Sequence, residues 1–289
     1  MHSPDAQTMF DDFCRHLVAL QVVYFLGEET KERTVQFYSG TLLCVENEIY
    51  FLTAGHVLED LREICGSPEV ILHSVALVDC FRSDAKYEEA IPFDFDPQDT
   101  ALLNRDEWGL DFGIIPLRPH YVSLLAKNEV VAISEQQWRS VRAGSLDGYY
   151  LVGLPSEFTE STHEKTEGGF ETTSTVSPTM IRLERLPEAP EGSPETTFPR
   201  FIGRIQDKGD IKSIKGMSGG PIVGLERVAE GRARYWIVAI QSSWLESKEV
   251  TFGCPIPVLA EMLKRAFINE LVDEDTLSDL VKAWKDAGF

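Results

Sequence analysis

Between residues 15 and 256, the chain is dominated by short runs of apolar and β-branched residues rather than by long amphipathic helices. The pattern predicts strands at 17–25, 35–44 and 48–53, and Glu46-Asn47 between the last two predicts a hairpin turn. Strands at this spacing are typical of an all-β sandwich or barrel. Further strands are expected at 70–81, 112–117, 149–152, 180–183, 222–225 and 235–241.

Two regions depart from this pattern. Residues 156–200 hold few large aliphatic side chains and many Glu, Thr, Ser, Pro and Gly, which predicts a long, mobile surface loop. Residues 257–271 and 276–287 instead carry apolar residues at helical spacing, and we expect two helices there. Their apolar stripes fit core packing better than a partner surface.

The charge balance narrows the range of partners. The 289 residues include 47 acidic and 27 basic ones, a net charge of −20, so the surface repels phosphate backbones and anionic membranes and favours basic peptides. The chain has no apolar run of about 18 residues and no secretory signal at its start. Cysteines scattered at 14, 44, 65, 80 and 254 predict neither a disulfide framework nor a zinc site. We therefore expect a cytoplasmic protein that binds neither nucleic acid nor membranes.

Three short motifs carry side chains suited to nucleophilic catalysis. FLTAGHVL places His56 after an apolar strand, WGLDFGIIPL places Asp111 at the head of another, and GMSGGP places Ser218 among glycines. A serine hydroxyl is a weak nucleophile that needs an adjacent base, and a carboxylate can orient that base. Taken alone, each residue is as well explained as a strand end or a turn residue. Asp99 and Asp106 are alternatives to Asp111, but only Asp111 directly heads an apolar strand.

In this order and spacing, the three motifs strongly resemble those of the chymotrypsin/trypsin-like serine peptidases, and within them the bacterial branch that lacks the secreted disulfides. TAGH matches the pattern around the histidine of the family, and GMSGGP matches its serine loop. The YSGTLL run also resembles a strand of that family. The resemblance covers about residues 15–256 and implies an all-β fold of two antiparallel β-barrels with the active site between them.

The resemblance also implies a role for each residue. Ser218 would be the nucleophile, His56 the general base and then the general acid, and Asp111 the group that orients His56. The backbone N–H groups of Gly216 and Ser218 would form an oxyanion hole. The implied activity is that of a serine endopeptidase that acts on a protein or peptide through an acyl-enzyme, without metal or cofactor.

The substrate pocket is harder to predict. Lys212, six residues before Ser218, would favour an acidic side chain before the cut, or it is an exposed lysine on a variable loop. Ser242 and Ser243 lie in a run that resembles the strand that pairs with the substrate backbone. Gly253 resembles a glycine of the pocket wall.

These inferences divide the chain into four parts. After an N-terminal segment, 1–14, we expect a first barrel over 15–120, a second barrel over 121–256 that contains the loop 156–200, and a helical tail over 257–289. The sequence shows no IVGG-like N-terminus, so it does not support activation by a newly cut terminal amine. Because an unregulated peptidase in the cytoplasm would be hazardous, we expect a regulatory protein partner or the long loop to keep the enzyme latent. The alternative is a catalytically silent fold that serves as a protein-binding module.

Overall fold

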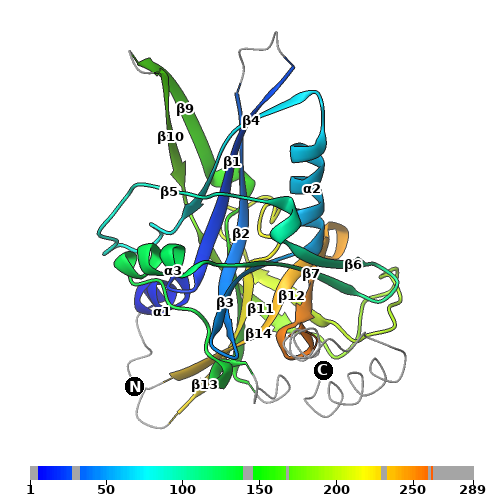
Figure 1. The fold of residues 1–289 in the computed structure, drawn as a ribbon. Coiled ribbons are helices and arrows are strands. Elements are labelled where there is room, and N and C mark those ends of the chain that lie inside the picture. Colours follow the sequence, from blue (N-terminus) through cyan, green and yellow to red (C-terminus); the bar gives the residue numbers. More distant parts are fainter. Residues whose placement is uncertain are drawn as a thin grey trace.

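The structure, a computed structural model, describes residues 6–27, 33–138, 146–166, 169–228, 233–259 and 262. The strands of these residues form two antiparallel units, one from each half of the chain, and a separate two-stranded hairpin (Figure 1). The first unit is a seven-stranded sheet and the second is a closed six-stranded barrel. The predicted all-β architecture, with one antiparallel unit in each half of the chain, is therefore confirmed.

The first unit holds seven strands, which are β1 (Leu17–Leu26), β2 (Arg33–Val45), β3 (Glu48–Thr53), β4 (Val70–Val78), β5 (Ile91–Pro92), β6 (Ala101–Arg105) and β7 (Leu110–Pro116). They lie in the order β5-β4-β1-β2-β3-β7-β6. Glu46 and Asn47, with φ angles of 50° and 72°, form the predicted two-residue turn between β2 and β3. In the described residues β5 and β6 do not pair with each other, so this unit is an open sheet rather than the closed barrel that we expected.

The second unit holds the six strands β8 (Gly148–Gly153), β11 (Thr179–Arg185), β12 (Phe201–Asp207), β13 (Pro221–Arg227), β14 (Ala233–Leu245) and β15 (Val250–Pro255). They close in the order β11-β12-β15-β14-β13-β8. Alternate residues of these strands point inward and fill the barrel, as the period of two along a strand requires. The core includes the buried side chains of Leu151, Ile181, Phe201, Ile222 and Val238.

The prediction of a long mobile loop over 156–200 is wrong. Most of its first half forms a hairpin of β9 (Thr159–Thr166) and β10 (Gly169–Val176), which projects away from the barrel (Figure 1), and β11 follows. Residues 172–178 alternate between half-buried and exposed, a pattern that Thr and Ser suit without large aliphatic side chains. Further on, the backbone N–H groups of Thr197 and Phe198 donate to carbonyls of residues 107 and 108, which fixes this segment to the first unit.

Helices occupy only short stretches of the described chain. They are α1 (Ala6–Cys14), α2 (Gly55–Gly66) and α3 (Pro119–Leu125), with 3₁₀ turns at Pro97–Asp99, Ala126–Asn128, Glu135–Gln137, Ser156–Phe158 and Glu246–Lys248. Helix α2 was not expected from the sequence. Residues 256–259 and 262 are helical, and the rest of the two predicted C-terminal helices lies outside the described residues. None of the helices in the described part of the chain has the length and apolar character needed to cross a bilayer.

The two units pack on a shared apolar core. One buried cluster contains Phe13 of α1, Leu17 and Leu110 of the first unit, and Val223 and Ile240 of the barrel. Burial of such side chains is the main favourable contribution to folding, about 1.5–3 kcal/mol for each large aliphatic or aromatic residue. This core sets the relative position of the two units.

His16 lies in the same interface and is only 2% exposed. Its Nδ1 is 2.6 Å from the carbonyl oxygen of Val131, and its Nε2 is 2.8 Å from the hydroxyl of Tyr235 in β14. Because a carbonyl only accepts, neutral His16 carries its proton on Nδ1, and Tyr235 donates to Nε2. Burial lowers the pKa of His16 from its ordinary value of 6.5, against the opposing effect of the bond to Val131. The folded protein therefore favours the neutral form of this side chain.

Acid should destabilise the fold through His16. Because the pKa of His16 is lower in the folded than in the unfolded chain, the unfolded state binds more protons below pH 6.5, and the free energy of unfolding falls by at most about 1.4 kcal/mol per pH unit. A His16→Gln variant keeps a donor and an acceptor but does not titrate. Urea unfolding between about pH 5.5 and 7.5 should show a steeper loss in the wild type than in the variant. An equal loss of unfolding free energy in both proteins would contradict the assignment of this pH dependence to His16.

Candidate active site

Asp111 heads β7, and its carboxylate binds His56 at two points. Oδ1 of Asp111 accepts the backbone N–H of His56 at 2.9 Å, and Oδ2 accepts Nδ1–H of the ring at 2.7 Å. His56 lies in the first turn of α2, where backbone N–H groups have no partner within the helix. The preceding residue, Ala54, offers no side-chain cap. Asp111 therefore caps α2 from a neighbouring strand and orients the imidazole at the same time.

Gly55 allows this close approach. A Cβ at residue 55 would lie 2.8 Å from the carbonyl oxygen of Leu103 and 2.9 Å from Oδ1 of Asp111, too close for any side chain. Gly55 of the TAGH motif is thus explained by the packing of α2 against β6 and β7.

Asp111 also affects the charge state of His56. The side chain of His56 is 37% exposed and that of Asp111 is 13% exposed. Burial by itself lowers the pKa of His56, but the hydrogen bond and negative charge of Asp111, with smaller contributions from Asp60 and Glu59, raise it above 6.5. Because a carboxylate accepts, the proton of neutral His56 sits on Nδ1 and leaves Nε2 as an acceptor. The ring is therefore oriented as a base.

The second unit fixes the backbone at Asp111. The N–H of Asp111 donates to Sγ of Cys254 in β15 at 3.2 Å, and the thiol of Cys254 donates to the carbonyl of Gly109 at 3.3 Å. Cys254 is fully buried. The carboxylate that orients His56 is therefore held from both units.

Ser218 lies in the tight loop that precedes β13. Gly216 and Gly219 have φ angles of 90° and 84°, in the left-handed region that side chains rarely adopt. A Cβ at Gly219 would also collide with the carbonyl oxygen of Ser39 and the side chain of Thr53. The glycines of GMSGGP are therefore required by the backbone shape and by close contact with the first unit.

Two backbone donors of this loop have no acceptor among the residues that the structure describes. The carbonyls of Lys215 and Met217 accept backbone hydrogen bonds of 2.8 and 2.9 Å from within the second unit. Since the C=O and N–H of a trans peptide point in opposite directions, the N–H groups of Gly216 and Ser218 point away from those bonds. Neither N–H has a partner among the described residues. They are the two donors that the resemblance to serine peptidases predicts for an oxyanion hole.

Ser39 of β2 ties the serine loop to the first unit. Its hydroxyl donates to the carbonyl of Gly216 at 2.8 Å and accepts from the N–H of Leu154 at 2.9 Å. Its own carbonyl accepts from the hydroxyl of Thr53 at 2.8 Å. Ser39 and Thr53 are fully buried. These bonds fix one peptide of the serine loop relative to the sheet that carries α2.

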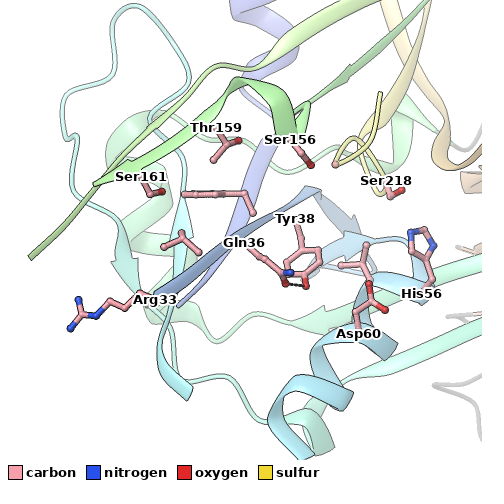
Figure 2. A pocket seen from close by; sticks show the side chains of 13 residues that line it. Arg33, Gln36, Tyr38, His56, Asp60, Ser156, Thr159, Ser161 and Ser218 are labelled. Atoms are coloured by element: carbon pink, nitrogen blue, oxygen red, sulfur yellow. Dashed lines mark hydrogen bonds between the residues drawn. The ribbon is translucent and has the colours of Figure 1, made fainter. Parts of the chain in front are cut away.

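Ser218 and His56 line one cavity of about 470 Å³ (Figure 2). Gly216, with its unpaired N–H, lines the same cavity. In the described residues no hydrogen bond joins Ser218 to His56, and such bonds are often long in ligand-free sites and tighten when substrate binds. The structure thus places two of the three predicted catalytic residues, His56 and Ser218, on the wall of one cavity, and the third, Asp111, is hydrogen-bonded to His56.

The four predicted pocket residues lie elsewhere. Lys212 is exposed, and its backbone N–H donates to Oε1 of Glu157 at 2.7 Å. Ser242 is buried, with its hydroxyl bonded to a backbone carbonyl of β15 at 3.3 Å, while Ser243 is exposed. Gly253 is buried in β15. None of the four lines the cavity of Ser218, and their role stays a prediction.

Two residues near the site received no role from the sequence. Ser39 belongs to the YSGTLL run, where the resemblance marks the strand but not the function of the hydroxyl. Asp60 lies four residues after His56 on α2 and lines the same cavity. Spacing of four residues places side chains on one face of a helix, so this signal depends on recognising α2.

The groups that could take part in a reaction at the site are side chains and backbone N–H groups. The cavity offers a hydroxyl, an imidazole whose pKa is raised, and two unpaired N–H donors. Across the described ranges, no three His, Cys, Asp or Glu side chains are placed to bind a metal ion together. A hydroxyl, a base and paired N–H donors are the groups that acyl transfer requires.

Comparisons with known proteins show a distant structural likeness. No protein-family model matches the chain, and no curated protein matches it in sequence. The thermostable serine protease AL20 from an extremophilic microorganism is similar with a TM-score of 0.43 and 15% identity, over 84% of this chain and 91% of that one. The protease Anisep from Arthrobacter nicotinovorans gives 0.42 and 15%, over 83% and 90%.

Ser39→Ala should slow the chemistry of Ser218. The change leaves the carbonyl of Gly216 and the N–H of Leu154 without partners, at a cost of about 1–3 kcal/mol in the free energy of unfolding, and loosens the loop that carries the two donors. We expect the rate at which a fluorophosphonate labels Ser218 to fall about 10- to 100-fold.

Thr41→Val is the matched control for this prediction. Thr41 is another fully buried hydroxyl residue of β2, it donates to the carbonyl of His16 at 2.7 Å, and it does not line the cavity. This variant should be destabilised to a similar extent but labelled within about threefold of the wild-type rate. Equal slowing in both variants would mean that Ser39 only supports folding.

Proposed function

We propose that the chain is a serine endopeptidase that hydrolyses protein or peptide substrates through an acyl-enzyme on Ser218. The observation that carries the proposal is the double hydrogen bond by which Asp111 holds His56 at the cavity that Ser218 lines. The unpaired N–H groups of Gly216 and Ser218 add support, because they supply donors for an oxyanion. The mechanism needs no metal or cofactor.

In the first half of the reaction, the Ser218 hydroxyl attacks the carbonyl carbon of the scissile peptide bond. Nε2 of His56 takes the hydroxyl proton as the C–O bond forms, and Asp111 stabilises the resulting imidazolium. The N–H groups of Gly216 and Ser218 stabilise the negative oxygen of the tetrahedral intermediate. His56 then gives its proton to the leaving nitrogen, the C–N bond breaks, and an acyl-enzyme and a free amine remain.

In the second half, water replaces the leaving amine. His56 removes a proton from the water as its oxygen attacks the acyl carbon, and the same two N–H groups stabilise the second tetrahedral intermediate. The bond to Ser218 breaks, and His56 returns a proton to the serine oxygen. The products are a carboxylic acid and the regenerated enzyme.

Specificity and control belong to the same proposal. Lys212 would favour an acidic side chain before the cut, with Ser242, Ser243 and Gly253 forming the surrounding wall. Control of a cytoplasmic peptidase would come from a protein partner. The region 156–200, which we first expected to serve as a mobile regulatory loop, is ordered in the hairpin and in β11, so it is less suited to that role.

Ser218→Ala should abolish both labelling by a fluorophosphonate and proteolysis. The variant removes the nucleophile but keeps the loop, so its folding should match that of the wild type. The measurement is labelling of both proteins, followed by a proteome-wide comparison of cleavage products.

Labelling of the wild type but not of the variant would support a competent nucleophile. Absence of labelling in both would instead support the silent binding module or a latent enzyme. Addition of cell lysate would separate these two, because only a latent enzyme would then become labelled.

The acidic limb of kcat/KM should lie above pH 6.5. Attack needs neutral His56, whose pKa is raised above 6.5 despite burial by the bond and charge of Asp111, so activity falls as the pH drops through that higher value. Asp111→Asn removes the charge and should move the limb to lower pH, with a loss in kcat of about 10⁴-fold.

Asp99→Asn tests the alternative carboxylate. Asp99 is exposed and pairs with Arg118 at 3.7 Å. This variant should keep both the wild-type rate and the wild-type limb. The role of Asp111 would be rejected if kcat/KM of the wild type fell only below pH 6.5. It would also be rejected if Asp99→Asn, rather than Asp111→Asn, shifted the pH dependence of kcat/KM.

A further inference from the structure

The cavity that holds Ser218 continues away from it between two strands. On one side it is lined by residues 33 and 35–38 of β2, and on the other by Ser156, Thr159 and Ser161 at the start of the β9–β10 hairpin (Figure 2). Asp60 of α2 lines it close to His56. The catalytic steps described above use neither strand, so this groove has no role in them.

The groove-facing edge of β2 is unpaired. The N–H of Leu42 donates toward the β1 side of the strand, and the carbonyl of Ser39 accepts on the β3 side. Because the backbone groups of successive residues point to alternate edges, those of Val35 and Phe37 point the same way as those of Ser39, away from β1. β3 pairs with β2 only from Thr41 onward, and no other described strand pairs along this edge.

The start of β9 has a free edge as well. The carbonyl of Phe158 accepts from the N–H of Ser177, on the side of β10. By the same alternation, the backbone groups of Thr159 and Ser161 point to the opposite edge, and among the described strands β9 pairs only with β10. Both residues line the groove. The hydroxyl of Thr159 is buried and has no hydrogen-bond partner in the described structure.

Asp60 gives the groove a negative charge near the reacting atoms. Its side chain is exposed, and no basic residue of the described ranges forms an ion pair with it. The chain as a whole carries a net charge of −20, which adds long-range attraction for a basic segment. The groove thus combines unpaired backbone groups with an unpaired carboxylate.

We propose that this groove binds the part of the substrate that follows the scissile bond, as an extended strand of about five residues with a basic side chain near its start, paired with Asp60. The inference rests on the proposed peptidase function. Five residues correspond to the length of β2 that lines the groove, since both strands rise by about 3.3 Å per residue. Backbone bonds to β2 and β9 give affinity, and Asp60 gives selectivity.

The mechanism indicates which part of the substrate, before or after the scissile bond, occupies this groove. His56 must give a proton to the leaving nitrogen, and Asp60 lies one turn beyond it on the same helix. None of the residues predicted for the pocket before the cut lines this groove. The leaving chain then runs away from Ser218, antiparallel to β2, whose residues run from Arg33 toward Ser39 and the serine loop.

Direct binding to the inactive full chain tests the groove without turnover. The protein is Ser218→Ala, and the probe is a peptide with a free N-terminal amine, the sequence Lys-Thr-Val-Thr-Val-Thr-Ser-Ser and a fluorescent label at its C-terminus. Fluorescence anisotropy should show at least about tenfold weaker binding after truncation to the first two residues, since each net backbone hydrogen bond is worth about fivefold. Equal affinity of the short and long peptides would overturn the proposal.

Backbone N-methylation separates strand pairing from simple contact. Methylation of the third or fourth peptide residue removes a donor inside the groove and should weaken binding about fivefold or more. The same change at the last residue falls beyond the groove and should have no effect. Equal effects at both places would mean that the peptide does not bind as a strand.

Charge reversal tests Asp60. Replacing the first lysine of the peptide by glutamate should weaken binding about three- to fivefold, the effect of an exposed ion pair, and Asp60→Lys should reverse this preference. The matched control is Glu63→Lys, the same change at an exposed residue of α2 that does not line the groove, and it should keep the preference for lysine. A preference unchanged by Asp60→Lys would remove Asp60 from the proposal.

Fluorophosphonate labelling of the wild type shows whether a negative result contradicts the proposed peptide-binding groove or the proposed peptidase activity. If a fluorophosphonate does not label Ser218 but the inactive chain still binds peptides with this dependence on length and charge, the groove is supported and the peptidase is not. If Ser218 is labelled and binding depends on neither length nor charge, the groove is overturned and the peptidase remains.

Discussion

The carboxylate of Asp111 is the contact on which the site depends. It supplies the cap that Ala54 does not provide at the start of α2, and it fixes the His56 ring through the other oxygen. The position of the imidazole is therefore determined by a strand far along the chain rather than by the sequence of α2 itself. Because the same bond holds the ring proton on Nδ1, it also determines which nitrogen can accept a proton from a nucleophile.

The arrangement also depends on how the two units dock. Ser218 lies in a loop of the second unit and His56 in helix α2 of the first unit, so their relative position is set at the interface between the units. Ser39 bonds the serine loop from the first unit, and Cys254 bonds the backbone of Asp111 from the second. These contacts are buried, where an unpaired polar group costs about 1–3 kcal/mol, so a shift between the units would break several bonds at once. The relative position of the residues at the site is thus fixed by buried polar contacts that run from each unit to the other.

Local signals in the sequence predicted much of the fold and pointed to the residues that the structure places at the candidate site. Short runs of apolar and β-branched residues marked β1, β2 and β3, and two residues with positive φ formed the predicted turn between β2 and β3. Glycines that the backbone requires marked the loop of Ser218. What could not be predicted depends on contacts between distant residues. Helix α2 lacks a cap of its own, and its cap comes from Asp111.

The hairpin of β9 and β10 was misread for a related reason. Composition separates loops from strands mainly by large aliphatic side chains, which a two-stranded sheet exposed to solvent does not need. The edge of β2 that faces this hairpin is unpaired because β3 pairs with β2 only from Thr41 onward, which no local pattern encodes. The unpaired groups at this one cavity then suggest what kind of ligand fits it. Two N–H donors suit a single carbonyl oxygen, but two strand edges suit only a ligand with a repeating backbone, and Asp60 adds a preference for positive charge. A small ester would satisfy the first requirement and leave the edges unpaired, so the groove favours a polypeptide.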